Sequence, residues 1–331
     1  MKAITFEKFG KSEEVLKIVD VDMPEVGEND VLVKMYTTTP NPSDTNKRNG
    51  SFPNLLDDGY VIPHSDGAGV VEAVGAGVDK SWIGKRVWLF NAQYGRRFGT
   101  AAQFISLNEE FIVELPDNIS FQEGACLGIP VMTAHRCLFS DGCIEGKTVV
   151  VAGGAGRVGN YAIQLAKKAG AKVIATIVED RDREACLEAG ADAVINGIAE
   201  DAAAQILEAN NGQRVDRIVE VQFGANLSLD LDIIALNGVI ATYNSTIVRE
   251  PVIPFFRAMY QCPTIKFVIV YAMPLEARLH AIKDITGWLE EGSIDIRVSE
   301  VLPMAQIAKA HDLIEAGQVR GAVVVNIDQE C

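Results

Sequence analysis

The chain has 331 residues, of which 48% are hydrophobic and 23% charged, and its formal net charge is −15 at pH 7. The acidic balance argues against nucleic acid as a partner, because binding to phosphates favours a basic surface. The length is enough for about two domains, and the sequence contains no apolar run long enough to span a membrane.

The six cysteines form no Cys-x-x-Cys pair and no spacing typical of a disulfide framework. The first residues of the chain lack the charged start and the long apolar region of a signal peptide. We therefore expect reduced thiols in a cytoplasmic protein.

The part of the chain before residue 120 has a β-rich pattern. Short apolar runs at 30–36, 69–75 and 85–90 are separated by turns rich in proline and glycine. Short strands with such turn signals are typical of a compact β domain. The sequence therefore predicts a β-rich domain at the start of the chain.

A glycine-rich motif follows an apolar, β-branched run in the middle of the chain. Residues 148–152 read Thr-Val-Val-Val-Ala, and Gly154-x-Gly156-x-x-Gly159 begins two residues later, where a helical pattern opens. Between a strand and a helix, such glycines allow a tight turn, close approach of the backbone to a pyrophosphate, and close packing of helix and strand. The start of the helix offers free N–H groups to the phosphates. This context favours dinucleotide binding over an ordinary strand-to-helix turn.

Strands and helices continue to alternate behind this motif. Val158, Ala162, Leu165 and Ala169 form one apolar stripe of the first helix. The apolar runs expected to be strands are 172–177, 193–196, 217–221, 238–244 and 265–271, and the helical patterns among them are 184–189 and 202–209. Nearly continuous apolar strands that alternate with helices indicate a parallel sheet covered on both faces. The sequence therefore predicts an α/β, doubly wound domain.

The pattern changes again after residue 272. One helix-like stretch occupies residues 275–290, and an apolar, β-branched run occupies residues 321–326. We expect this last run to be a strand that returns to the first domain.

Four segments resemble the medium-chain dehydrogenase/reductase superfamily, and within it the zinc-free quinone oxidoreductases of the zeta-crystallin-like branch. They are residues 41–44 (Asn-Pro-Ser-Asp), 63–75, 128–136 and 153–159, in the family's order and spacing. The resemblance implies a GroES-like catalytic domain formed by residues 1–125 and 273–331, and a Rossmann dinucleotide-binding domain formed by residues 126–272. It also implies an NADPH:quinone oxidoreductase-like enzyme that forms a homodimer.

Zinc-dependent members of the superfamily hold a catalytic zinc with a Cys, a His and a second Cys. The matching positions here are Asn41, Ser65 and Ile129, none of which replaces a thiolate or imidazole ligand. His64 stands one position away, where an extended segment would point its side chain in the other direction, so we expect a hydrogen-bonded or half-exposed histidine. No cysteine precedes Cys126, so the superfamily's four-cysteine structural zinc site is missing as well. We expect no metal.

Without a metal to polarise a plain carbonyl, the acceptor must stabilise the product charge itself. Quinones and conjugated enones delocalise that charge, and the protein then supplies orientation and one hydrogen-bond donor. By resemblance, Asn41 is the donor that orients the acceptor between the domains, and Thr133 contacts cofactor or substrate. The alternative for Asn41 is a turn-forming residue before Pro42, and for Thr133 a threonine that caps the start of its own helix.

Further cofactor contacts follow from the resemblance and from the rule that ligands lie at the carboxyl ends of parallel strands. Tyr243 and Asn244 match the family's cofactor-contacting turn, and residues 267–270 match a strand that lies near the nicotinamide and pairs across the homodimer. The residues expected to contact the cofactor are Gly153, Gly154, Ala155, Gly156, Arg157, Val158, Gly159, Thr176, Arg181, Tyr243, Asn244, Phe267 and Val270.

The second strand of the doubly wound domain ends without the acidic residue that NAD-specific folds place about 20 residues past the glycines. Ile177 occupies that position, and Arg181 and Arg183 follow soon after. Either arginine can form a fork with a 2′-phosphate, which favours NADPH over NADH. The alternative is a solvated surface turn in which Glu179 and Asp180 neutralise these arginines.

Two other functions remain open on the sequence alone. Residues 41–46 also resemble mitochondrial-type enoyl-thioester reductases, which would make the chain an enal, enone or enoyl-thioester double-bond reductase. Those enzymes use a tyrosine shortly downstream, where Phe52 offers no hydroxyl, and the quinone reductases' own tyrosine is replaced by Asn46. The second alternative is a cofactor-binding structural or RNA-binding protein with little turnover.

Overall fold

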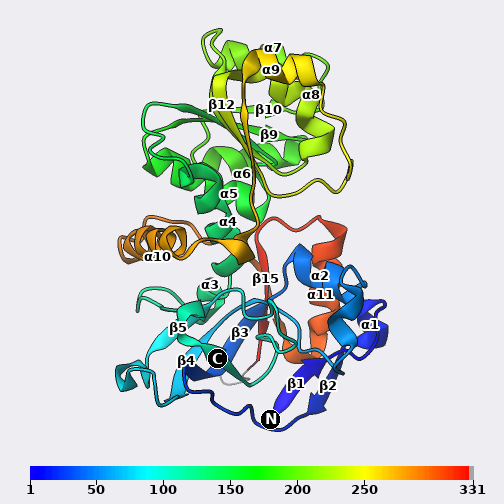
Figure 1. The fold of residues 1–331 in the computed structure, drawn as a ribbon, viewed down its shortest axis with the longest axis vertical. Helices are drawn as coiled ribbons and strands as arrows, with labels where there is room; N and C mark the ends of the chain where they lie inside the picture. Colours follow the sequence, from blue (N-terminus) through cyan, green and yellow to red (C-terminus); the bar gives the residue numbers. More distant parts are fainter. Residues whose placement is uncertain (328–331) are drawn as a thin grey trace. The chain divides into compact units, whose positions relative to one another are not determined.

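The computed structural model describes residues 1–327 and contains two compact units. Unit 1 consists of Met1–Ile129 together with the chain from Ile282 onward, and unit 2 consists of Pro130–Ala281. Figure 1 shows a β-rich unit 1 and a unit 2 in which helices and strands alternate. The fold therefore combines a β-rich domain with an α/β domain, as the sequence predicts.

The boundaries between the units differ by a few residues from the expected ones. They fall after residues 129 and 281 instead of after residues 125 and 272, four and nine positions later. One boundary lies inside helix α4 (Gly128–Phe139) and the other inside helix α10 (Leu275–Glu290). The last four residues of the expected segment, 328–331, lie outside the described residues.

A seven-stranded, mostly antiparallel sheet forms the centre of unit 1. Its strands, in spatial order, are β14 (Val298–Pro303), β15 (Ala322–Asn326), β3 (Asp30–Thr39), β4 (Asp66–Val74), β5 (Arg86–Leu89) and β7 (Ile112–Glu114), and β6 (Phe104–Asn108) also pairs with β3. Val31, Val33 and Met35 of β3 are buried and alternate with half-buried residues, as expected for a strand with one face on the core. β15 pairs with β3 at Val325 and Thr38, so the C-terminal strand returns to the first domain as predicted.

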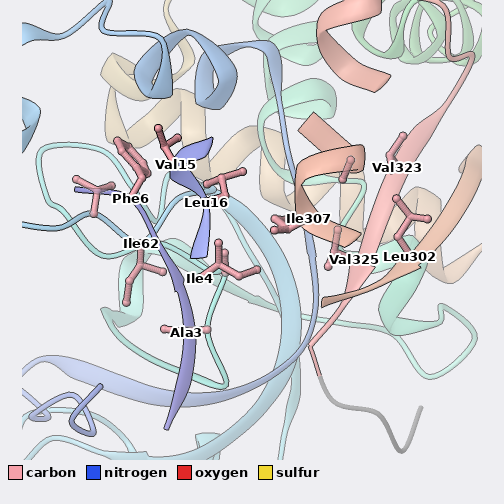
Figure 2. Close-up of a cluster of buried hydrophobic side chains, with 14 residues drawn as sticks. Ala3, Ile4, Phe6, Val15, Leu16, Ile62, Leu302, Ile307, Val323 and Val325 are labelled. Carbon is pink, nitrogen blue, oxygen red and sulfur yellow. The ribbon is translucent and has the colours of Figure 1, made fainter. Parts of the chain in front are cut away.

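The core of unit 1 is built from both early and late parts of the chain. Figure 2 shows Ile4, Phe6 and Val15 in one buried cluster with Ile307 and Val323. Burying such side chains contributes roughly 1.5–3 kcal/mol each. The remaining elements of unit 1 are the antiparallel pair β1 (Lys2–Thr5) and β2 (Lys17–Asp20), the helices α1 (Ser12–Val15), α2 (Pro42–Arg48), α3 (Phe121–Gly124) and α11 (Ile307–Ala316), and the 3-10 turns η1 (Pro53–Leu56), η2 (Lys80–Trp82), η3 (Glu109–Phe111) and η6 (Met304–Gln306).

Unit 2 contains a six-stranded parallel sheet whose strand order matches a Rossmann domain. In spatial order the strands are β10 (Ala193–Asn196), β9 (Lys172–Ile177), β8 (Thr148–Ala152), β11 (Val215–Glu220), β12 (Ile234–Thr242) and β13 (Thr264–Phe267). Numbered along the chain, this is the order 3-2-1-4-5-6 of dinucleotide-binding sheets. The connecting elements are α5 (Arg157–Lys168), α6 (Arg183–Glu188), α7 (Ala202–Ala209), α8 (Phe223–Ile233), α9 (Phe255–Gln261) and the 3-10 turns η4 (Asp180–Asp182) and η5 (Val270–Ala272).

Several predicted elements have the bounds that the sequence indicates, and others do not. The strands at 172–177 and 193–196 and the helices at 202–209 and 275–290 agree residue for residue. The sixth strand is shorter than predicted, because β13 ends at Phe267 and a 3-10 turn follows. The stretch after residue 272 holds β14 and α11 in addition to the predicted helix and strand. In the part of the chain that the structure describes, no helix is both long and apolar enough to cross a bilayer.

Candidate functional site

The glycine motif lies between β8 and α5, behind the carboxyl end of β8. Gly153 has φ +66°, a left-handed conformation that glycine adopts without strain. A Cβ on Gly154 would lie 2.8 Å from Cβ of Ala175 and 2.9 Å from Sγ of Cys186. A Cβ on Gly159 would lie 2.3 Å from the carbonyl oxygen of Gly153. These glycines therefore allow the turn to form and allow α5 and β9 to pack closely against it.

Gly156 is the N-cap of α5, and its backbone is exposed. The N–H groups in the first turn of a helix have no acceptor within the helix and carry the positive end of its dipole. Arg157 and Val158 belong to this turn and are half-buried, whereas Ala155 is buried beneath it. The arrangement fits a pyrophosphate bound at the start of α5.

The order of the strands reverses between β8 and β11, where open parallel sheets bind their ligands. The glycine motif is the loop that follows β8 along the chain, and the loop that follows β11 begins with Val221. A Cβ on Gly153 would lie 3.0 Å from Cγ1 of Val221, so the two loops meet. The N–H of Gly154 donates to the carbonyl oxygen of Thr176 at 3.1 Å. The structure thus brings Thr176 and the glycine motif together at the carboxyl ends of β8 and β9.

The turn after β9 carries charges of both signs. Nε of Arg181 lies 2.6 Å from Oε2 of Glu179, and both side chains are more than half exposed. Arg183 donates through Nη1 to the carbonyl oxygen of Val194 at 2.6 Å, which ties it to β10. The last residue of β9 is Ile177, which is apolar and buried, so no carboxylate stands at the end of this strand. Among the described residues, Arg181 pairs only with another exposed side chain, whereas Arg183 is also bonded to the backbone of β10. Arg181 therefore suits a 2′-phosphate better than Arg183.

Tyr243 and Asn244 directly follow β12. The N–H of Tyr243 donates to the carbonyl oxygen of Glu220 at 3.1 Å, and the carbonyl oxygen of Asn244 accepts from the N–H of Phe223 at 3.2 Å. Burial, followed by the nearby Cys137 and Glu220, raises the pKa of Tyr243 well above its usual value, so its phenol stays neutral. Both residues are therefore fixed at the carboxyl end of the sheet.

Phe267 and Val270 lie at and just beyond the end of β13, the outermost strand of the sheet. The side chain of Phe267 is 73% exposed, whereas Val270 is buried in η5. The N–H of Val268 donates to the carbonyl oxygen of Thr242 at 2.7 Å, which keeps this segment beside the end of β12. The structure thus places Val270 near the Tyr243 turn and leaves Phe267 on the surface of the described chain.

In unit 1, two buried carboxylates hold Asn41. Its N–H donates to Oδ2 of Asp44 at 2.8 Å, and its Nδ2 donates to Oδ2 of Asp66 at 2.8 Å. The N–H of Ile129 lies 3.0 Å from both oxygens of Asp66. Because a carboxylate only accepts hydrogen bonds, the amide nitrogen of Asn41 must face Asp66. Asn41 is also the N-cap of α2, so the predicted turn role and a fixed amide orientation occur together.

The residues at the three zinc-ligand positions do not fit a zinc ion. The amide of Asn41 and the backbone of Ile129 converge on Asp66. The hydroxyl of Ser65 is buried and has no hydrogen-bond partner among the described residues. A Cβ on Gly128 would lie 2.1 Å from Oδ1 of Asp66, so the backbone closes directly on that carboxylate. An amide, a hydroxyl and an apolar side chain do not form a tetrahedral set of thiolate and imidazole ligands.

His64 is a buried histidine with protein partners on both ring nitrogens. Its Nδ1 lies 2.9 Å from Oγ1 of Thr38, and its Nε2 lies 2.9 Å from Nε2 of His311. The prediction of a hydrogen-bonded histidine is confirmed, but the expected extended backbone is wrong, because φ of His64 is +77°. Burial lowers the pKa of His64 well below its usual value and that of His311 to about 3, so both rings are neutral near pH 7.

Thr133 lies in the second turn of α4 and is 4% exposed. The alternative that Thr133 caps the start of its helix is wrong, because α4 begins five residues earlier at Gly128. Thr133 and the residues around the glycine motif belong to unit 2, whereas Asn41 belongs to unit 1.

Asp44 and Asp66 were not among the predicted site residues, although both lie in segments that carry the resemblance. Asp44 had a local signal, because an acidic residue three positions after an N-cap asparagine is typical of a capping box. Asp66 had none, because its partners are 25 and 63 positions away along the chain.

Comparison with known proteins gives the family. Residues 27–117 match the family model of the alcohol dehydrogenase GroES-like domain, and residues 158–285 match that of zinc-binding dehydrogenase. The quinone oxidoreductase of Lama guanicoe is 30% identical over 330 residues, which cover 98% of this chain and 97% of that protein. The 2-methylene-furan-3-one reductase of Solanum lycopersicum is 35% identical over 202 residues, which cover 59% of this chain and 52% of that protein. The structure of mycobacterial Rv1454c complexed with NADPH is 26% identical with a TM-score of 0.87, and the match covers 98% of this chain and all of that one.

The similarity extends over both units. The GroES-like match lies within unit 1, and the dehydrogenase match covers most of unit 2. The glycine motif has the geometry of a dinucleotide site, in agreement with the NADPH-bound structural neighbour. The chain is therefore an oxidoreductase and belongs to the quinone oxidoreductase family of the medium-chain dehydrogenase/reductase superfamily.

Proposed function

We propose that this enzyme reduces quinones or similar conjugated carbonyl compounds with NADPH and without zinc. The observation that carries the proposal is the hydrogen-bond set around Asp66. At positions where zinc-dependent relatives hold a metal ion, Asn41 and the backbone of Ile129 bind this carboxylate instead. Acceptors that delocalise the product charge do not require a Lewis acid.

NADPH supplies the hydride in this scheme. The glycine motif and the first turn of α5 would bind its pyrophosphate, and Arg181 its 2′-phosphate. The chain behind β12 and β13, with Tyr243 and Val270, would contact the nicotinamide half. Asn41 would orient the acceptor, and Thr133 would contact the cofactor or the acceptor.

Chelation of metal and substitution of Asn41 test the proposal together. Steady-state reduction of 1,4-benzoquinone by NADPH should be unchanged after exhaustive dialysis against a zinc chelator. Asn41→Ala should lower kcat/KM for the quinone by roughly ten- to a hundredfold, because a preorganised donor is lost. Activity that disappears on chelation and returns with added zinc would overturn the proposal.

A second candidate function is reduction of the carbon–carbon double bond of an enal, an enone or an enoyl thioester. The similarity to the 2-methylene-furan-3-one reductase favours it. Phe52, at the position of the tyrosine used by enoyl-thioester reductases, is 55% exposed and offers no hydroxyl. Phe52→Tyr should therefore raise turnover of an enoyl thioester if this candidate is right, and turnover that stays at the wild-type level would count against it.

We also propose a homodimer that pairs through β13. This strand is the last in its sheet; Phe267, its final residue, is 73% exposed, and Ile269, which follows it, is 59% exposed. An exposed edge strand with apolar side chains is suited to pairing with a second chain.

A further inference from the structure

Lys47 is a buried lysine in the last turn of α2. It is 7% exposed, and lysine is rarely buried unless it is paired. Its Nζ donates to the carbonyl oxygen of Gln93 at 2.7 Å and lies 3.9 Å from Oδ1 of Asp44. The hydrogen bonds described above that hold Asn41 in place do not involve this ammonium group.

The carboxylates near Lys47 are the two that hold Asn41. Asp44 faces Lys47 with Oδ1 and accepts from the N–H of Asn41 with Oδ2. Asp66 accepts from the side-chain amide of Asn41, and its charge acts on Lys47 as well. Burial lowers the pKa of Lys47, whereas Asp44 and Asp66 raise it. The ammonium group therefore lies near Asp44 and interacts electrostatically with Asp66, and Asn41 is bonded to both carboxylates.

We propose that Lys47 is a positioning residue for Asn41, because its ammonium group keeps Asp44 and Asp66 charged and therefore able to hold the amide in one orientation. This inference rests on the proposed role of Asn41 in orienting the acceptor. It assigns a role in the reaction to a residue that need not touch cofactor or substrate.

The physical reason is the cost of burying charge. Without Lys47, the two buried carboxylates would lose the positive charge that favours their ionised form, and burial would then favour uptake of a proton by one of them. A protonated Asp66 can donate a hydrogen bond, so it would no longer require the amide nitrogen of Asn41 to face it. Burial, followed by His311 and then Lys47, lowers the pKa of His64, so His64 stays neutral.

Lys47→Met is the central variant, and Lys85→Met is its matched control, because Lys85 pairs with Glu114 on the surface. We expect Lys47→Met to lower kcat for quinone reduction by roughly tenfold and to leave KM for NADPH within about twofold. In an Asn41→Ala background, Lys47→Met should have little further effect on kcat, because coupled residues are not additive. An equal loss of kcat in both backgrounds would show a merely structural role and overturn the proposal.

Lys47→Met/Asp44→Asn provides a rescue. The amide oxygen of the new asparagine can still accept from the N–H of Asn41, and one of the two buried negative charges is removed together with the ammonium group. We therefore expect the double variant to recover most of the kcat lost in Lys47→Met. A double variant no more active than Lys47→Met would contradict the role of the ammonium as a counter-charge.

A readout without turnover separates this inference from the proposed function. The side-chain amide signal of Asn41 in an ¹⁵N–¹H NMR spectrum, assigned by its loss in Asn41→Ala, should shift in Lys47→Met and not in Lys85→Met. If the signal shifts but the wild-type enzyme reduces no quinone or enone, the proposed function fails while the structural part of the inference stands. An unshifted signal in Lys47→Met overturns the inference itself.

Discussion

Arg181 and Glu179 form an exposed ion pair at the end of β9. Such pairs contribute about 0–1 kcal/mol, so a 2′-phosphate, which carries more charge and accepts a bidentate fork, can take the guanidinium from Glu179. Arg181→Ala should weaken NADPH binding by roughly tenfold, and Glu179→Gln should strengthen it, with NADH affinity unchanged in both. Fluorescence titration gives these dissociation constants.

Arg183→Ala serves as the control for this pair, because Arg183 is tied to the carbonyl oxygen of Val194. It should affect NADPH and NADH equally. If Arg181→Ala weakens both cofactors to the same degree, Arg181 does not read the 2′-phosphate.

Glu220 and Asp230 form a buried pair of carboxyl groups that joins β11 to α8. Glu220 accepts from Asn226 at 2.9 Å and also hydrogen-bonds to Asp230. Burial raises the pKa of both groups, and the charge of Glu220 raises that of Asp230 further, well above its usual value. The folded protein thus keeps a proton that the unfolded chain releases near pH 4.

The stability of the wild-type fold should therefore fall as pH rises from about 4 toward the folded pKa of Asp230. Asp230→Asn replaces the proton of the carboxylic acid with an amide N–H that does not titrate. We expect the difference in melting temperature between Asp230→Asn and wild type to grow in favour of the variant between pH 5 and pH 9, by an equivalent of about 1 kcal/mol or more. A difference that is constant over this range would show that the pair does not share a proton.

Residues whose chemistry depends on close neighbours along the chain could be predicted from the sequence. Residues whose chemistry depends on distant parts of the chain could not. Arg181 and Glu179 are visible as a charged turn after a strand. Glu220 and Asp230 are not visible as a pair, because an acidic residue in an isolated segment is expected at the surface. Only the packing of α8 against β11 brings their side chains together.

The turn between β8 and α5 is the element on which cofactor binding depends. Gly159→Val would place side-chain atoms against the carbonyl oxygen of Gly153, which already lies 2.3 Å from an ideal Cβ. Because that neighbour is backbone, the helix must move away from the turn, and we expect loss of NADPH binding with a lowered melting temperature. Gly156→Ala meets the same oxygen at 3.3 Å and should weaken binding more than it destabilises the fold.

Gly287→Ala in α10 is the matched control for the glycine substitutions. Nothing lies within 4 Å of its ideal Cβ, and alanine favours a helix over glycine by about 1 kcal/mol. It should keep NADPH affinity and raise the melting temperature slightly. NADPH affinity that survives Gly159→Val at the level of this control would place the pyrophosphate elsewhere.

At the level of elements, strands with continuous apolar runs were predictable and elements with buried polar residues were not. β8, β9 and β10 show β-branched runs with few interruptions. α11 buries Ile307, Ala310 and His311 on one face, and the histidine interrupts the apolar stripe. β13 was predicted too long, because the apolar run continues to Val270 although the chain turns after Phe267.

The proposed homodimer concerns the molecule as a whole. Replacing Phe267 and Ile269 with lysine would place charges along the exposed edge of the parallel sheet, which opposes strand pairing between chains. Sedimentation velocity should show about twice the 35.8 kDa chain mass for the wild type and a single chain for the double variant. A wild-type monomer, or a double variant that remains dimeric, would contradict pairing through β13.

The architecture of the whole chain followed from its resemblance and from the alternation of its strands, but the acceptor did not. The apolar pattern and the glycine motif are local, and they specify a Rossmann sheet and a phosphate site. The group that orients the acceptor depends on Asn41, Asp66 and Ile129, which are far apart in the chain. These residues come together only in the folded chain. The acceptor must therefore be identified by measuring activity with candidate substrates.

The most direct measurement is oxidation of NADPH and of NADH, each with 1,4-benzoquinone and with an enone, followed by nicotinamide absorbance against an enzyme-free blank. We expect quinone-dependent oxidation with a higher kcat/KM for NADPH than for NADH. Oxidation with the enone alone would assign the enzyme to double-bond reduction, and no oxidation with any of the four pairs would contradict the proposed function.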